Sequence, residues 1–417
     1  MNLELAVATR DAAYLAAAAA VRQQLAAPCR REPESAGAAV VRSAHPFAER
    51  RLAEEWRKRP RAARGARGAD RHQVGGSSAA ALIDQEEVER PRPLEPASFA
   101  SAATAAEHSR AGSATYLTLP EWLIVYDTEE YAAFISRARP SGFPYLRSIV
   151  DFWRDYSRVC AVSCGAFPFD VGDHVMIVVI GSSFAVENIL KGLYENVVGR
   201  AFELVSGHDT EEDAFAARVA AEYGQFMHTV PWYEFPFGRK LTALWRETPL
   251  WGRHPLRKWE RRIALSSEYA LKGSYGWLIR AATKAAYGDE NPKTYVRAAK
   301  VPAELDGLPV ERVRPLENGE EILAFERYEK FTPAAAALAA RGMRFVDIAG
   351  NTRVLVTVIA APGTRWSDAA ARALFSQPLA TDPPRERLAL DVDVTALGPL
   401  IAALPGQGVS LEHIYDF

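Results

Sequence analysis

Residues 174–200, HVMIVVIGSSFAVENILKGLYENVVGR, decide how the middle of this chain folds. An apolar run at 175–180 passes without a break into a segment with helical spacing. Three structures fit this stretch: a helix of a packed core, a segment in contact with a membrane, and a strand, turn and helix that carry a serine nucleophile. We expect the first, because helical patterns surround the segment.

Composition limits the classes of protein to consider. The chain has 417 residues, enough for two or three domains, and its 48% hydrophobic and 24% charged residues are ordinary for a soluble protein. A net charge of -2 gives no field that would attract nucleic acid, so no such partner is expected. Three cysteines cannot form a disulfide framework, which favours a reducing, cytoplasmic location. The sequence has no Walker A loop or dinucleotide fingerprint, and we predict no cofactor.

Changes in residue type along the chain predict an α+β protein in four parts. Residues 1–113 form an Ala- and Arg-rich arm that lacks the apolar surface to fold, and no aromatic residues interleave its arginines as single-strand binding would require. An aromatic-rich, mainly helical domain follows at 114–290, then a linker at 291–308, then a domain of strands and helices at 309–417.

Helices in the second part are predicted from spacing and from their start signals. Asp127 with Glu130 is a capping-box pattern that would begin a helix at 127–138, and Thr210 with Asp213 would begin another that runs to about Met227. Further helices are expected at 143–159 and 256–286.

The last part alternates short β-like runs with helices. Strands are predicted at 321–325, 343–348, 354–359, 388–392 and 409–415, with helices at 332–340 and 395–404. Two halves can be overlaid, since Gly342, Met343, Phe345 and Ile348 recur as Gly408, Val409, Leu411 and Ile414. This recurrence predicts a ferredoxin-like βαβ-repeat sandwich with an added hairpin strand.

The closing segment GVSLEHIYDF, which follows a helix, resembles the last strand of ACT-type ligand-sensing domains. The resemblance covers only the 309–417 domain. It implies amino-acid sensing at a loop between the first strand and helix, across a homodimer interface. Residues 327–330 occupy that loop and lack the glycine often found there. The central domain resembles bacterial proteins of unknown function, which adds no chemistry.

One catalytic hypothesis comes from the opening segment. The run 175–180 is followed by Gly181-Ser182-Ser183-Phe184-Ala185 and then by a helix, the order that a nucleophile elbow needs, with Ser183 as nucleophile. Ala185 stands where glycine is usual, and the surroundings are helical rather than parallel β. We therefore favour serines within a helix, bonded to backbone carbonyls.

A second constellation occurs twice, 81 residues apart. Glu187, Lys191 and Tyr194 surround Gly192, and Glu268, Lys272 and Tyr275 surround Gly273 in the same spacing. On a helix each set shares one face, and a mid-helix glycine favours close packing. Phe-Pro-Phe at 167–169 and at 235–237 precedes the two copies and favours duplication. The alternatives are a polar cavity between two related helices and a duplicated packing unit with solvated ion pairs, which we prefer.

Cysteine and aromatic residues suggest two further sites. Cys160 and Cys164, followed by Asp173 and His174, have spacing compatible with a metal, but without a second ligand pair we expect core cysteines and no metal. Trp232, Trp245 and Trp251 lie among basic residues in 232–258, a mixture suited to a membrane surface. No apolar run reaches the ~18 residues of a spanning helix, so none is predicted.

From these observations we expect a non-enzymatic bacterial protein, in the cytoplasm, that senses a small ligand or forms a homodimer through 309–417. The alternatives are a peripheral membrane protein that uses 232–258 and a serine hydrolase that uses Ser183.

Overall fold

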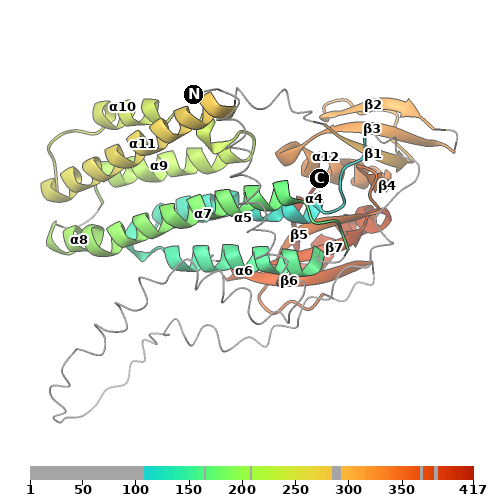
Figure 1. Ribbon diagram of the computed structural model, residues 1–417, viewed down its shortest axis with the longest axis horizontal. Helices are drawn as coiled ribbons and strands as arrows, with labels where there is room; N and C mark the ends of the chain where they lie inside the picture. The colour runs from blue at the N-terminus through green and yellow to red at the C-terminus, as the bar shows by residue number, and fades with distance from the viewer. Residues whose placement is uncertain are drawn as a thin grey trace, which may run out of the picture.

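The computed structural model describes residues 108–163, 166–206, 209–283, 293–316, 318–366, 370–379 and 384–417. It is an α+β structure in which a bundle of long helices stands at one end and two antiparallel sheets at the other (Figure 1). The predicted arm at 1–113 lies outside the described residues except for 108–113. There His108 stacks on Tyr295, and the Arg110 N–H donates to the Ala349 carbonyl, so this end of the arm packs on the sheets.

The helices of the first domain run along one long direction (Figure 1). Residues 175–180 lie within α7, so they are helical as expected, and the strand of the nucleophile-elbow alternative is absent. A π-helical turn, Glu195–Gly199, joins α7 to α8. The helices of this domain are α4 Ala114–Leu117, α5 Leu119–Ile135, α6 Tyr145–Ser163, α7 Val171–Tyr194, α8 Arg200–Ser206, α9 Glu211–Met227, α10 Phe237–Glu247 and α11 Pro255–Thr283.

One of the two predicted capping boxes is confirmed. The Thr210 side chain accepts from the Asp213 N–H, and the Asp213 carboxylate accepts from the Thr210 N–H, at the start of α9. The start predicted at Asp127 is wrong, because α5 begins eight residues earlier at Leu119, with Pro120 in its first turn. Proline fits there because that turn needs no N–H from it.

The second domain contains two four-stranded sheets whose paired strands are all antiparallel. The first has the order β2-β3-β1-β4 and the second β6-β7-β5-β8. Helix α12, Phe331–Ala340, precedes β4, and α13, Leu397–Ala403, precedes β8. The strands are β1 Lys293–Ala299, β2 Val310–Pro315, β3 Glu320–Glu326, β4 Arg344–Ile348, β5 Arg353–Ala360, β6 Ala371–Leu379, β7 Arg385–Asp393 and β8 Ser410–Ile414.

All five predicted strands and both predicted helices are present, at β3, β4, β5, β7, β8, α12 and α13. Strand β1 is central in its sheet although it lies inside the predicted linker 291–308, so that segment is not a simple linker. The predicted recurrence matches the two sheets: Gly342 and Gly408 both have positive φ and stand just before β4 and β8. The two sheets thus repeat one β-β-β-α-β unit.

Two apolar cores hold this domain in place. One lies between the sheets and α12 and α13, and includes Val356 and Leu390. The other joins the opposite face of the second sheet to α4–α7, where Leu355 and Ala389 meet Tyr116, Trp122 and Phe152. The second sheet is therefore covered on both faces and fixes the helical bundle to the α/β domain.

Candidate functional site

The helical domain buries a cluster of charges beside an apolar cluster that includes Phe215, Leu244 and Leu265. Four cations in the first two turns of α11, Arg257, Lys258, Arg261 and Arg262, are each at most 2% exposed. Their carboxylate partners come from the π-helical turn, α8, α9 and α11 itself. The pairs include Arg257 with Glu260 at 2.7 Å and Glu203 at 3.3 Å, Lys258 with Glu212 at 2.9 Å, Arg261 with Glu195 at 2.6 Å, and Arg262 with Glu212 at 2.6 Å.

This ionic interior is electrically balanced. Adding Lys191 and Lys272 gives six cations, which face eight carboxylates. Two of those carboxylates, Glu187 and Glu211, have side chains 47% and 53% exposed, so six cations and six carboxylates form the shielded part. A buried charge is tolerated only when it is paired, and this pairing provides that condition.

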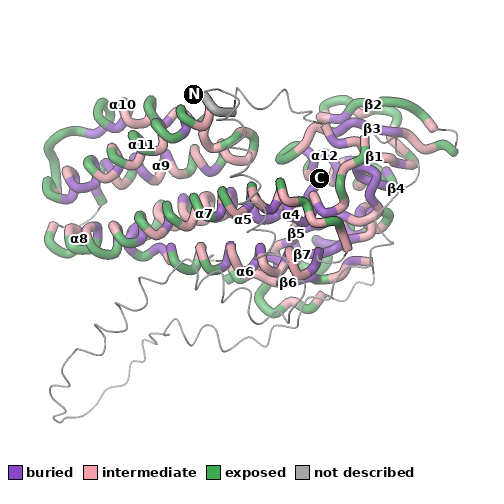
Figure 2. Tube along the Cα trace, in the orientation of Figure 1, coloured by how far each residue is buried: buried purple, intermediate pink, exposed green. Residues whose placement is uncertain are grey.

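The outer surface of α7, the π-helical turn, α8 and α11 carries many apolar side chains. Helix α7 buries one aliphatic side chain, Ile177, with polar or small residues, whereas most of its exposed large side chains are aliphatic. Its other buried residues are His174, Gly181, Asn188, Gly192 and the adjoining Glu195. Exposed and buried positions alternate along α7 and α11 (Figure 2). The exposed large apolar residues of α7, the π-helical turn, α8 and α11 are Met176, Val179, Val186, Leu190, Leu193, Val197, Leu204, Val205, Leu256, Ile263, Leu271, Tyr275, Trp277 and Leu278, and we call this set the apolar face.

The apolar face includes a helix long enough to cross a bilayer. The continuous helical stretch Val171–Ser206 has 36 residues, and 17% of its most apolar window is buried. It is the one helix in the described part of the chain with this length and composition, although the sequence argument expected no spanning helix. That argument counted Glu187, Lys191 and Glu195 as interruptions, whereas Lys191 and Glu195 turn inward to ion partners.

The predicted polar helix pair comes together across α7 and α11. Lys191 lies 3.2 Å from Glu268, and Lys272 lies 2.6 Å from Glu187 and 3.2 Å from Glu268. We call these four residues the crossed quartet. The two tyrosines of the prediction lie elsewhere: the Tyr194 hydroxyl donates to Glu260 at 2.5 Å, and the Tyr275 ring packs on Trp232.

The duplication behind the quartet extends over three helices. Phe143-Pro144-Tyr145 leads into α6 and Phe235-Pro236-Phe237 leads into α10, so the counterpart of 235–237 is 143–145, not the predicted 167–169. The ammonium of Lys191 lies 4.0 Å from the Tyr131 ring centroid and that of Lys272 lies 5.1 Å from Tyr223, with the tyrosines on α5 and α9. Helices α5, α6 and α7 therefore correspond to α9, α10 and α11.

The two copies run in opposite directions. Trp122 near the start of α5 meets His228 at the end of α9, and Glu129 packs on Gly224, so the two helices are antiparallel. In the quartet, the lysine of each copy pairs with the glutamate of the other. Residues 119–206, the first half, and 211–283, the second half, are thus an inverted repeat with the crossed quartet between them.

Ser183 is not a nucleophile on an elbow. It lies within α7, and its hydroxyl donates to the Val179 carbonyl at 3.0 Å, as expected for a serine in a helix. Of the histidines that could act as a general base for such a serine, His228 and His254 lie on other elements, and His208 is outside the described residues. Cys164 is also outside them, Cys160 is a free thiol, and no cluster of potential metal ligands occurs among the residues that the structure places.

The predicted membrane-contact tryptophans belong to two separate aromatic clusters. Trp245 and Trp251, 46% and 73% exposed, both contact Trp259 near the start of α11. Trp232 instead contacts Tyr275, close to exposed Trp277 near the other end of this helix. Trp259 and Trp277 are 18 residues apart on α11, which is about 27 Å at 1.5 Å per residue.

The apolar joint between the domains also contains buried polar groups. The Tyr116 hydroxyl donates to Asp391 at 2.8 Å, and Trp122 packs on His413 with ring centroids 3.9 Å apart. Burial, with a smaller contribution from nearby His228, lowers the pKa of His413 to about 3, so this imidazole is neutral in the folded protein.

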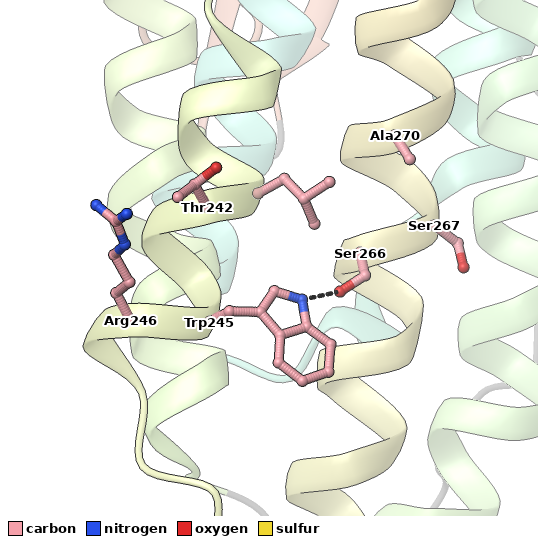
Figure 3. A pocket seen from close by; sticks show the side chains of 7 residues that line it. Thr242, Trp245, Arg246, Ser266, Ser267 and Ala270 are labelled. Carbon is pink, nitrogen blue, oxygen red and sulfur yellow. Dashed lines mark hydrogen bonds between the residues drawn. The ribbon is translucent and has the colours of Figure 1, made fainter.

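A shallow groove lies between α10 and α11 (Figure 3). The groove is open to the outside and has a volume of about 640 Å³. Trp245 closes one end of it, and its indole N–H donates to the Ser266 hydroxyl at 3.0 Å. Its lining is Leu241, Thr242, Trp245, Arg246, Ser266, Ser267 and Ala270.

The sequence signal for the ionic interior was present but was not used. Positions 257, 258, 261 and 262 repeat at a helical spacing, and a basic stripe of this kind is normally a solvated face. The acidic partners come from four separate segments, so only the fold brings them together. Comparison of the chain with models of protein families, with characterised proteins and with solved structures found no match. The class rests on the geometry: an inverted-repeat helical domain with an ionic interior, joined to a duplicated α/β domain.

Proposed function

We propose that this is a membrane protein whose helical domain inserts its apolar face into the bilayer, with the charged face of α9 in water, and holds the α/β domain at the membrane surface. The observation that carries the proposal is a buried cluster of paired charges in the same helices whose outer surface carries the apolar face. Water would favour the opposite arrangement, whereas in hydrocarbon ionisable side chains face the bundle interior and pair with one another.

Three other features support the proposal. The ~27 Å between the Trp259 and Trp277 levels is close to the ~30 Å of a hydrocarbon core, and tryptophans concentrate at both edges of that layer. Small residues allow close helix approach, as at Gly181 against Phe152 and Gly192 against Tyr145. Inverted repeats with a polar centre recur in membrane transporters.

The test is membrane extraction of the full chain. We expect the protein to stay in the membrane pellet after an alkaline carbonate wash and to be released by detergent. Leu190→Lys, on the apolar face, should reduce the membrane-retained fraction, because a lysine near the bilayer centre costs about 3 kcal/mol.

The matched control is Ala221→Lys on α9, an exposed position next to Glu222 on a face that also carries Arg218. It should be retained like the unmodified chain. Recovery of the unmodified chain as a soluble monomer without detergent would overturn the proposal, and a soluble oligomer would instead assign the apolar face to a second copy.

A role in ligand sensing or dimerisation is a second candidate, favoured by the sheet topology. The order β2-β3-β1-β4 is that of a ferredoxin-like split βαβ sheet in which a loop, 300–309, stands in place of the first helix, and β6-β7-β5-β8 repeats it. Thermal unfolding with each proteinogenic amino acid would test sensing. A higher unfolding temperature with one or a few amino acids supports sensing. If no amino acid shifts the unfolding temperature and the protein is a monomer in detergent, both the sensing and the dimerisation roles are excluded.

A further inference from the structure

The groove between α10 and α11 breaks the symmetry of the inverted repeat. Three small residues line it on α11, and the first half has larger aliphatic residues at two of their equivalents: Ser267 corresponds to Val186 and Ala270 to Ile189. Trp245 corresponds to Trp153, so the closed end is common to both halves. The groove therefore exists because the second half leaves out side chains that the first half carries.

The charges beside the groove break the symmetry in the same place. In the first half Asp151 lies between two arginines, with its carboxylate 3.2 Å from Arg147 and 2.9 Å from Arg154. The equivalent arginines on α10 are Arg239 and Arg246, and Ala243 stands at the equivalent of the aspartate. Within the described residues both α10 arginines are exposed and neither has an ion pair.

We infer that the second half binds an anionic phospholipid, with an acyl chain in the α10–α11 groove and its phosphate between Arg239 and Arg246. The first half shows that two arginines at this spacing hold one anion, since Asp151 occupies that position there. A phosphodiester is the anion that a bilayer supplies, and arginine binds it through charge-assisted hydrogen bonds. The apolar lining of Leu241, Trp245 and Ala270 suits a hydrocarbon chain.

This inference rests on the proposed membrane location, but its test is separate. The full chain, purified in detergent, is mixed with phosphatidylglycerol or with phosphatidylcholine of the same acyl chains, and bound lipid is counted by native mass spectrometry. We expect phosphatidylglycerol to be retained about tenfold better, a ratio that corresponds to one charge-assisted contact.

Two kinds of variant separate the headgroup from the chain. Arg246→Gln and, independently, Ala243→Asp, which restores the aspartate of the first half, should both remove the preference for phosphatidylglycerol. Ser267→Val with Ala270→Ile, the residues of the first half, should reduce retention of both lipids. Arg344→Gln, at an exposed arginine of β4, is the control and should leave both unchanged.

Each outcome decides the inference. Equal retention of the two lipids by the unmodified chain, or an unchanged preference in both Arg246→Gln and Ala243→Asp, overturns it. Displacement of phosphatidylglycerol by millimolar inorganic phosphate assigns the arginines to a soluble phosphate instead. A dimer broken by the Ser267→Val, Ala270→Ile pair assigns the groove to a second copy. A carbonate-resistant protein with no lipid preference leaves the membrane proposal standing and removes only this site.

Discussion

The helical domain buries a cluster of charges beneath an apolar face, whereas the α/β domain has an apolar core between its sheets and helices. Strand β5 buries Val354, Val356 and Val358 completely, whereas α11 buries Arg257 and exposes Trp277. Both arrangements follow one rule. The outer surface matches the surrounding solvent, and any charged groups in the interior are paired with one another. Under the proposed membrane location, the two domains face different solvents. The predictions below test this contrast, beginning with the largest expected effect.

Loss of one charge from the ionic interior should damage the helical domain most. Glu212 is fully buried and accepts from both Lys258 and Arg262. Glu212→Gln leaves two buried cations short of a partner, and we expect a loss of about 4 kcal/mol in the free energy of unfolding in detergent. Glu222→Gln removes the exposed ion pair with Lys240 and should change the free energy of unfolding by less than about 1 kcal/mol. Equal effects of the two substitutions would contradict an ionic interior.

In the α/β domain an apolar truncation should have the large effect. Leu390 in β7 is fully buried between the sheets and the helices, and Leu390→Ala should lower the free energy of unfolding by about 3 kcal/mol. Leu271→Ala on the exposed face of α11 should change it by about 0.5 kcal/mol or less in detergent. The contrast between the domains is contradicted if, in urea unfolding, Leu271→Ala lowers the free energy of unfolding more than Leu390→Ala does.

The domain joint should weaken in acid. Burial holds the pKa of His413 at about 3, below the ~6.5 of an unfolded histidine, so the unfolded state binds a proton that the folded state excludes. Stability is therefore lost as the pH falls below ~6.5, by about 2 kcal/mol at pH 5. His413→Asn should remove that part of the pH dependence between pH 7 and 5. If the free energy of unfolding falls equally steeply with pH in the variant and the parent, a group other than His413 causes the pH dependence.

The crossed quartet should show a small but coupled effect. Lys191→Met or Lys272→Met alone leaves Glu268 with one lysine, and each should cost about 1 kcal/mol. The double variant leaves Glu268 without a cation and should cost more than the sum of the two. Chemical unfolding in detergent measures all three, and strict additivity would mean that the quartet does not act as one unit.

Much of the α/β domain could be predicted from the sequence, because its central strands are short apolar runs and glycines follow its helices. Strands β2 and β6 were missed: β2 is a charged edge strand, and β6 carries Pro378 and few alternating apolar residues. Strand β1 was assigned to the linker because prolines and charges surround it. In these places tertiary pairing, rather than local propensity, decides the structure.

The sequence also predicted the repeated Glu-Lys-Gly pattern and the pairing of its two helices, but not their relative direction. Local spacing is the same in parallel and inverted repeats, so only the fold could show that Lys191 reaches Glu268 and Lys272 reaches Glu187. The burial of the charged stripe of α11 could not be predicted for a similar reason. A helix with one apolar and one charged stripe is amphipathic in either solvent, and the sequence does not say which stripe is buried.

The most direct test of the account is the accessibility of nitroxide labels in bilayers. Labels would be placed at Leu190 and Leu271 on the apolar face and at Ala214 on α9, after replacement of the three native cysteines. The account predicts that the labels at 190 and 271 collide with oxygen and are shielded from a water-soluble nickel chelate, with the opposite result at 214. Nickel accessibility at all three positions would contradict it.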